Sequence, residues 1–220
     1  MRFLTDWDNP IINVIAKAFD LFILTLLWIF LCCTVIGIGP ACVALYYSVV
    51  KTIRRDRSSS VKEFLRSIKD SWKVSLPIGL LVAIFIVSTC MIDYPNILIL
   101  FSYETTYQLF AGILSCLKVL FLLAIMVYIF PIISRFQAGV IKSVTSSVML
   151  LLRHFIATIL MILIVVVAAI STIVLPLLIV IVPAATAFVL SFVMEPILLL
   201  YTASDDKEVD VEKDQWYLGQ

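Results

Sequence analysis

Two charged residues, Lys118 and Glu195, interrupt long apolar segments of this 220-residue chain. Charged side chains are costly inside a bilayer and often functional, so they are the first candidates for chemistry. Counted from the outer end of each segment, their depths are roughly 14 and 17 Å, near the middle of a ~30 Å hydrocarbon core. The sequence therefore predicts that they pair, either as a structural ion pair between two helices or as a polar site for a proton or substrate group.

Motifs for other chemistry are missing from the sequence. It contains no phosphate-binding loop, nucleophile elbow or zinc-protease motif. The five cysteines are not spaced with the single histidine, His154, as zinc ligands would be. The net charge of +1 gives no bulk attraction to nucleic acid. We therefore expect no catalytic residue, no cofactor, no metal ion and no nucleic-acid partner, and a protein that is not an enzyme.

The elements that must position Lys118 and Glu195 are transmembrane helices. Hydrophobic residues make up 63% of the chain and the mean hydropathy is +1.13. Five segments are long and apolar enough to cross a bilayer: 21–39, 74–92, 109–131, 156–178 and 184–201. The sequence predicts an all-α integral membrane protein, with these five transmembrane helices bundled in one domain over residues 1–203. Residues 204–220 are expected to form an acidic cytoplasmic tail.

Lysine and arginine are distributed unevenly between the connections. The first connection, 51–73, holds eight of them, whereas 93–108 holds none. The third contains Arg135, Lys142 and Arg153, and the fourth again has none. Because positive residues stay on the cytoplasmic side, this alternation predicts a multi-pass plasma-membrane protein with its N-terminus outside and its C-terminus in the cytoplasm.

An amphipathic helix is expected at 60–73 in the first cytoplasmic connection. Ser60 and Glu63 fit a capping box. Apolar residues then recur at helical spacing, and basic residues fall largely on the other side: the apolar set is Val61, Phe64, Leu65, Ile68 and Trp72, and the basic set is Lys62, Arg66, Lys69 and Lys73. The helix is expected to contact anionic lipid headgroups or to pack internally, and the alternative is a docking surface for a cytosolic partner.

A second amphipathic segment at 136–153 follows the third predicted span. Each half of the chain then reads as a span, a proline, a basic amphipathic segment and a second span. This order suggests a two-fold internal repeat, with the fifth span as an additional helix.

Three stretches resemble a known family: residues 36–47 (IGIGPACVALYY), 64–69 (FLRSIK) and 130–136 (FPIISRF). They are similar to the YesL-like family, also called the domain of unknown function 624, and the similarity extends over about residues 1–200. Its members are small polytopic proteins of mostly Gram-positive bacteria, commonly encoded beside carbohydrate ABC importers. The resemblance implies a role connected with sugar uptake, and the family offers no catalytic residues to carry over.

These observations lead to one favoured function and two alternatives. The favoured function is a non-catalytic accessory subunit or regulator of a carbohydrate ABC importer, with the importer's permease subunits and membrane lipids as partners. A corner at the end of the first span is expected to be either a tight structural turn or a docking site for a permease: it comprises Gly37, Gly39, Pro40, Tyr46 and Tyr47. The alternatives are a small transporter or channel, alone or as a homo-oligomer, with a polar site at Lys118 and Glu195, or an envelope factor that handles lipid-linked saccharides.

Overall fold

The computed structural model describes residues 10–54, 59–99, 106–136 and 139–205, and every regular element within them is a helix. Most of the predicted acidic tail, from residue 206 on, and the first nine residues of the predicted outer N-terminus lie outside the described residues. The predicted all-α class is confirmed for the part of the chain that the structure describes.

Five helical segments are long and apolar enough to span a membrane, as predicted. They are α1 (Pro10–Cys32), α3 (Ser60–Ser88) with its continuation, α5 (Thr106–Phe136), α7 (Phe155–Val174) and α8 (Val182–Asp205). Helix α3 continues through a π-helical segment, η3 (Thr89–Asp93), into α4 (Tyr94–Ile99). The chain is therefore a multi-pass helical membrane protein.

The predicted end of the first span, residue 39, lies beyond the observed end of the helix. Helix α1 stops at Cys32, and a turn and a short 3-10 helix, η1 (Val35–Gly37), lead into a separate helix, α2 (Ile38–Ser48). In the turn, the Thr34 hydroxyl donates to the Leu31 carbonyl at 2.7 Å. Apolar residues continue past the turn because α2 is buried against other helices, and hydropathy alone does not separate such a helix from a span.

The second predicted span is part of a longer helix. Residues 60–73, expected as a separate surface helix, and 74–92 belong to one continuous α3–η3–α4 segment, which retains Pro77 inside α3. The predicted capping box is also wrong. Ser59 is the residue that precedes the helix, with no side-chain cap, and the Glu63 carboxylate instead pairs with Lys51.

Helix α2 lies at the centre of the fold. Its Ala41, Val43 and Ala44 are fully buried, as are Val49 and Val50 in the π-helical segment η2 (Val49–Arg54) that follows it. A helix that is apolar on all sides is typically enclosed by protein or lipid. Here protein encloses it, because α2 and η2 contribute side chains to all three apolar clusters of the core.

A pair of glycines lets α2 approach α3 closely. A Cβ atom on Gly39 would lie 2.7 Å from the Gly79 backbone nitrogen, and one on Gly79 would lie 2.5 Å from the nitrogen of Gly39. The face of α3 that packs here is otherwise rich in serine, with Ser67, Ser71 and Ser75 buried. Small residues at such a contact allow two helix backbones to approach.

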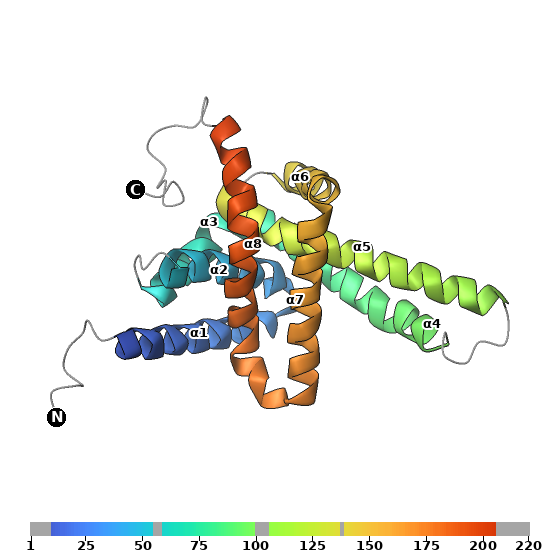
Figure 1. Ribbon diagram of the computed structural model, residues 1–220, viewed down its shortest axis with the longest axis horizontal. Helices are drawn as coiled ribbons and strands as arrows, with labels where there is room; N and C mark the ends of the chain where they lie inside the picture. The colour runs from blue at the N-terminus through green and yellow to red at the C-terminus, as the bar shows by residue number, and fades with distance from the viewer. Residues whose placement is uncertain (1–9, 55–58, 100–105, 137–138, 206–220) are drawn as a thin grey trace.

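Three apolar parts leave this centre in different directions (Figure 1). Helix α1 runs to one side, α4 and α5 lie side by side on the opposite side, and α7 and α8 form a third, antiparallel hairpin. We call η3, α4 and the adjoining residues 106–121 of α5 the arm. Only 11% of the apolar stretch of α1 and of that of α7 is buried, so most of their side chains face outward.

The second amphipathic segment is a helix, α6 (Val140–Arg153), that joins α5 to α7. It buries Ser143, Ser147, Leu150 and Leu151 and exposes Lys142. A 3-10 segment, η4 (Pro176–Val180), makes the connection between α7 and α8. The two-fold internal repeat stays a prediction.

Candidate functional site: a buried polar cluster

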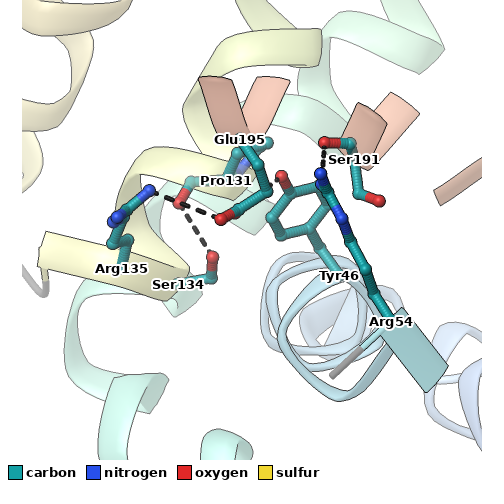
Figure 2. A network of polar contacts seen from close by, with 7 residues as sticks. All are labelled: Tyr46, Arg54, Pro131, Ser134, Arg135, Ser191 and Glu195. Atoms are coloured by element: carbon teal, nitrogen blue, oxygen red, sulfur yellow. Dashed lines mark hydrogen bonds and ion pairs between the residues drawn. The ribbon is translucent and has the colours of Figure 1, made fainter. Parts of the chain in front are cut away.

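Four elements bring polar side chains together at the centre of the fold (Figure 2). The Tyr46 hydroxyl of α2 donates to Glu195 Oε1 at 3.3 Å, and Arg135 Nη1 of α5 lies 3.5 Å from Glu195 Oε2 of α8. Arg54 of η2 donates to the Ser191 carbonyl of α8. We call Tyr46, Arg54, Arg135, Ser191 and Glu195 the central cluster.

The central cluster places a carboxylate between a hydroxyl and a guanidinium away from solvent. Glu195 is 2% exposed, and the side chain of Arg135 is 1% exposed. Burial, together with the neighbouring Glu195 carboxylate, raises the pKa of Tyr46 well above its ordinary value. Tyr46 therefore stays protonated and donates its hydrogen to Glu195.

Arg54 donates a hydrogen bond to the backbone of α8 close to Pro196. Pro196 lies inside α8 and lacks an N–H group, so the Phe192 carbonyl loses its usual helical donor. The Arg54 guanidinium donates to the neighbouring Ser191 carbonyl, and its central carbon lies 4.9 Å from the centre of the Phe192 ring. Glu195 and Pro196 therefore mark a point at which η2 attaches to α8.

A second buried ion pair lies between η2 and α3. Lys51 Nζ is 3.0 Å from Glu63 Oε2, and both side chains are almost fully buried. Lys51 also donates to the Tyr47 hydroxyl at 3.1 Å. Burial alone would lower the pKa of Lys51, but its hydrogen bonds with Tyr47 and Glu63 outweigh this effect and raise it. Lys51 thus stays charged and links η2 to α3.

The predicted pair of Lys118 and Glu195 is wrong. Lys118 Nζ lies 2.7 Å from Asp93 Oδ2 and donates to the Ser88 hydroxyl at 3.3 Å, whereas Glu195 meets Tyr46 and Arg135. The depth estimate failed because the part of α5 that holds Lys118 packs against α3, η3 and α4, whereas α8 meets the C-terminal half of α5, where Arg135 lies. Asp93 is the partner because α3 extends through η3, so that Asp93 belongs to a helix and not to an outer loop.

The predicted docking corner is used for internal packing. Gly39, Pro40 and Tyr46 are buried, and Gly37 and Tyr47 are half-buried. Gly39 contacts α3, and Tyr46 bonds to α8. The prediction that a permease docks on Gly39, Pro40 and Tyr46 is therefore wrong, because these residues are buried inside the chain.

The basic residues of α3 lie on its outer side. Lys62, Arg66, Lys69 and Lys73 are all exposed. The apolar residues of the predicted amphipathic helix do not share one environment: Phe64 is buried and Ile68 is half-buried, but Val61, Leu65 and Trp72 are exposed. Serines take their place on the packing face because α2 approaches too closely for larger side chains. Contact with lipid headgroups stays a prediction.

An apolar groove of about 400 Å³ runs between α7 and α8. Its walls include Leu163, Val167, Ala185 and Val189, with Ser171 and Thr186 as the hydroxyl-bearing residues. Both hydroxyls already donate to carbonyls of their own helices, Ser171 to Ala168 and Thr186 to Val182. The surface of the groove is therefore apolar, whereas the central cluster is made of polar and charged side chains.

The central cluster attaches the helices to one another. Its side chains connect α2, η2, α5 and α8, and the Lys51–Glu63 pair adds α3. Fold and site together define a polytopic helical membrane protein built around an enclosed central helix. Residues 21–94 match the family model described as "Protein of unknown function, DUF624", and the recognition of this family is thereby confirmed on that segment.

The matched segment comprises the C-terminal half of α1 and all of η1, α2, η2, α3 and η3. The stretch at 36–47 that carries the resemblance is thus the central helix and its entry. Neither the curated proteins nor the solved structures contain a match to this chain.

Proposed function

We propose that this protein is a non-catalytic accessory subunit or regulator of a carbohydrate ABC importer in the plasma membrane. The observation that carries the proposal is the outward exposure of apolar side chains on all three parts that leave the centre. Such surfaces suit lateral contact with other membrane helices, here the permease subunits, as well as with lipid. The connection with sugar import rests on the family resemblance.

The use of the ionisable residues also supports this proposal. Within the described spans, Lys118 pairs with Asp93, and Arg135 pairs with Glu195. Each pair joins two helices of the chain, and the two pairs lie on different helix contacts. A route for a sugar through this chain alone would need several free hydrogen-bonding groups facing a common space. The accessory function needs no such route.

A transport experiment tests the proposal. Sugar uptake by native cells is compared with uptake by cells that lack this protein and by cells in which it is restored. The purified protein is also assayed alone in vesicles loaded with the same sugars. We expect uptake to change in the deletion strain, to recover on restoration, and to be absent from the vesicles. Uptake into vesicles by the protein alone would contradict the accessory function and favour a transporter.

One observation favours a second function, an envelope factor that handles lipid-linked saccharides. Val61, Leu65 and Trp72 are exposed on α3 beside its four exposed basic residues. Apolar and basic side chains next to one another suit the boundary between acyl chains and anionic headgroups. Retention of a specific saccharide lipid through purification would support this function, and its loss on substitution of Lys69 and Lys73 by Gln would connect it to α3.

A further inference from the structure

The arm carries an ion pair in which the carboxylate is buried and the ammonium group is partly exposed. The Asp93 side chain is 2% exposed, whereas that of Lys118 is 40% exposed. Lys118 lies about 18 Å along α5 from Thr106 and about 27 Å from Phe136, so it is far from both ends of the helix. The ammonium group is therefore the charged group that the outside of the arm presents.

Lys118 does not extend toward the membrane surface. Lysines in spans usually do so, which relieves the cost of their charge. Here the 2.7 Å ion pair with Asp93 holds the ammonium group beside a buried carboxylate, and the Ser88 hydroxyl accepts a hydrogen bond from it at 3.3 Å. An ammonium group has three donors. Among the residues that the structure describes, Asp93 and Ser88 are the two polar partners of this group.

A local irregularity positions the carboxylate. Asp93 closes the π-helical segment η3, in which Cys90, Met91 and Ile92 are exposed. Such segments are rare and are frequent at functional sites. One turn further on, the Asn96 amide donates to the Ser115 hydroxyl at 3.4 Å, so polar contacts continue between the two helices of the arm.

The surroundings of Lys118 are apolar and exposed. Leu114, Leu117 and Phe121 lie within four residues of Lys118 on α5, and each is at least half exposed. Hydrocarbon can cover these side chains, but it offers no acceptor to the remaining N–H of Lys118. A neighbouring transmembrane helix with a carboxylate, amide or hydroxyl oxygen can cover both.

We propose that this face of the arm docks a transmembrane helix of the importer's permease subunit, and that a hydrogen-bond acceptor on that helix meets Lys118. This inference rests on the accessory function proposed above and gives it a contact surface. The partner helix is defined by its chemistry: an apolar surface that matches Leu114, Leu117 and Phe121, with one polar acceptor near the middle of the span.

Photo-crosslinking in native membranes tests the surface directly. A photoreactive phenylalanine replaces Leu114 or Phe121 beside Lys118, or Ile159 on α7 as the control. Phe121 and Ile159 are 50% and 53% exposed, so a difference between them does not come from accessibility. We expect adducts with a permease subunit from positions 114 and 121 and none with it from position 159.

Removal of the charge pair tests the role of Lys118. The double variant Asp93→Asn with Lys118→Met avoids leaving a buried carboxylate without its cation. An interhelical hydrogen bond in a membrane is worth enough to lower permease recovery by roughly 3- to 20-fold when it is lost. We expect this loss with little change in melting temperature, and near-normal recovery for Lys118→Arg, which keeps the donor.

The outcomes separate this inference from the accessory function. Undiminished permease recovery with the double variant, or permease adducts from position 159 alone, would overturn the arm as the docking face and leave the accessory function standing. Adducts from 114 and 121 with a second copy or with lipid only would also overturn it. If no permease subunit accompanies the protein in any form, the accessory function itself fails.

Discussion

Glu195 is the residue on which three elements converge, because its carboxylate meets Tyr46 of α2 and Arg135 of α5. Removal of one partner from a buried ion pair leaves an uncompensated charge, whereas removal of both can be nearly neutral. The free energy of unfolding thus depends on the pairing more than on either residue alone. This difference can be measured.

Arg135→Met is expected to lower the free energy of unfolding by about 3–5 kcal/mol, because Glu195 would stay buried without its cation. The double variant Arg135→Met with Glu195→Met should recover most of that loss. Denaturant unfolding in detergent micelles gives both values. If the double variant were as unstable as the single one, the ion pair would not be the reason for the loss.

Lys118→Leu is expected to lower the free energy of unfolding by about 1–3 kcal/mol, because Asp93 would be left buried without its partner. Addition of Asp93→Asn should restore stability. Lys142→Leu is a suitable control, since Lys142 is an exposed lysine on α6. Equal effects of Lys118→Leu and Lys142→Leu on the melting temperature would argue against a structural role for the Asp93 pair.

At the scale of elements, the contact between α2 and α3 decides how the centre is built. Gly39 and Gly79 face each other so closely that neither site has space for a methyl group. Gly39→Ala is therefore expected to cost about 1–3 kcal/mol through displacement of one helix. Thermal unfolding in detergent would report this as a lower melting temperature.

Gly139→Ala provides the matched control. A Cβ atom on Gly139 would meet no atom within 4 Å, and Gly139 has φ near −60°, which alanine adopts readily. We expect a change within about 1 kcal/mol, because the residue only precedes α6. A Gly139→Ala loss as large as that of Gly39→Ala would show that the effect does not come from the helix contact.

The sequence predicted five spans because the length of an apolar segment and the alternation of charge between connections do not depend on how the helices pack. It did not predict where α1 ends, because residues 33–39 and α2 are as apolar as a span although protein buries α2. It also did not predict that serines line the packing side of α3. Serines are compatible with either side of a helix, and only the close approach of α2 selects them.

The pairing of the charged residues could not be predicted from the sequence for a related reason. Arg135 and Asp93 were assigned to connections, since nothing in the composition shows that α5 and α3 continue through them. Lys51 and Glu63 pair across two elements whose packing the sequence does not specify. Pairing depends on which helices are neighbours, and hydropathy carries no information about neighbours.

At the scale of the whole molecule, the charge alternation makes a prediction about orientation. In a variant without native cysteines, a cysteine in place of Leu177 on η4 should react with an impermeant maleimide added to intact cells. A cysteine in place of Ile141 on α6 should react only after the cells are opened. Both sites are more than four-fifths exposed in the structure, so burial does not protect either. The reverse pattern would contradict the positive-inside orientation.

The accessory function makes the most direct claim about the whole molecule, namely that it occurs in a complex. The decisive measurement is affinity purification from the native host in mild detergent, with mass spectrometry of the proteins recovered and a membrane protein of similar size as the control. We predict stoichiometric recovery of the permease subunits of a carbohydrate ABC importer. Recovery of this protein alone, or only with further copies of itself, would contradict the account.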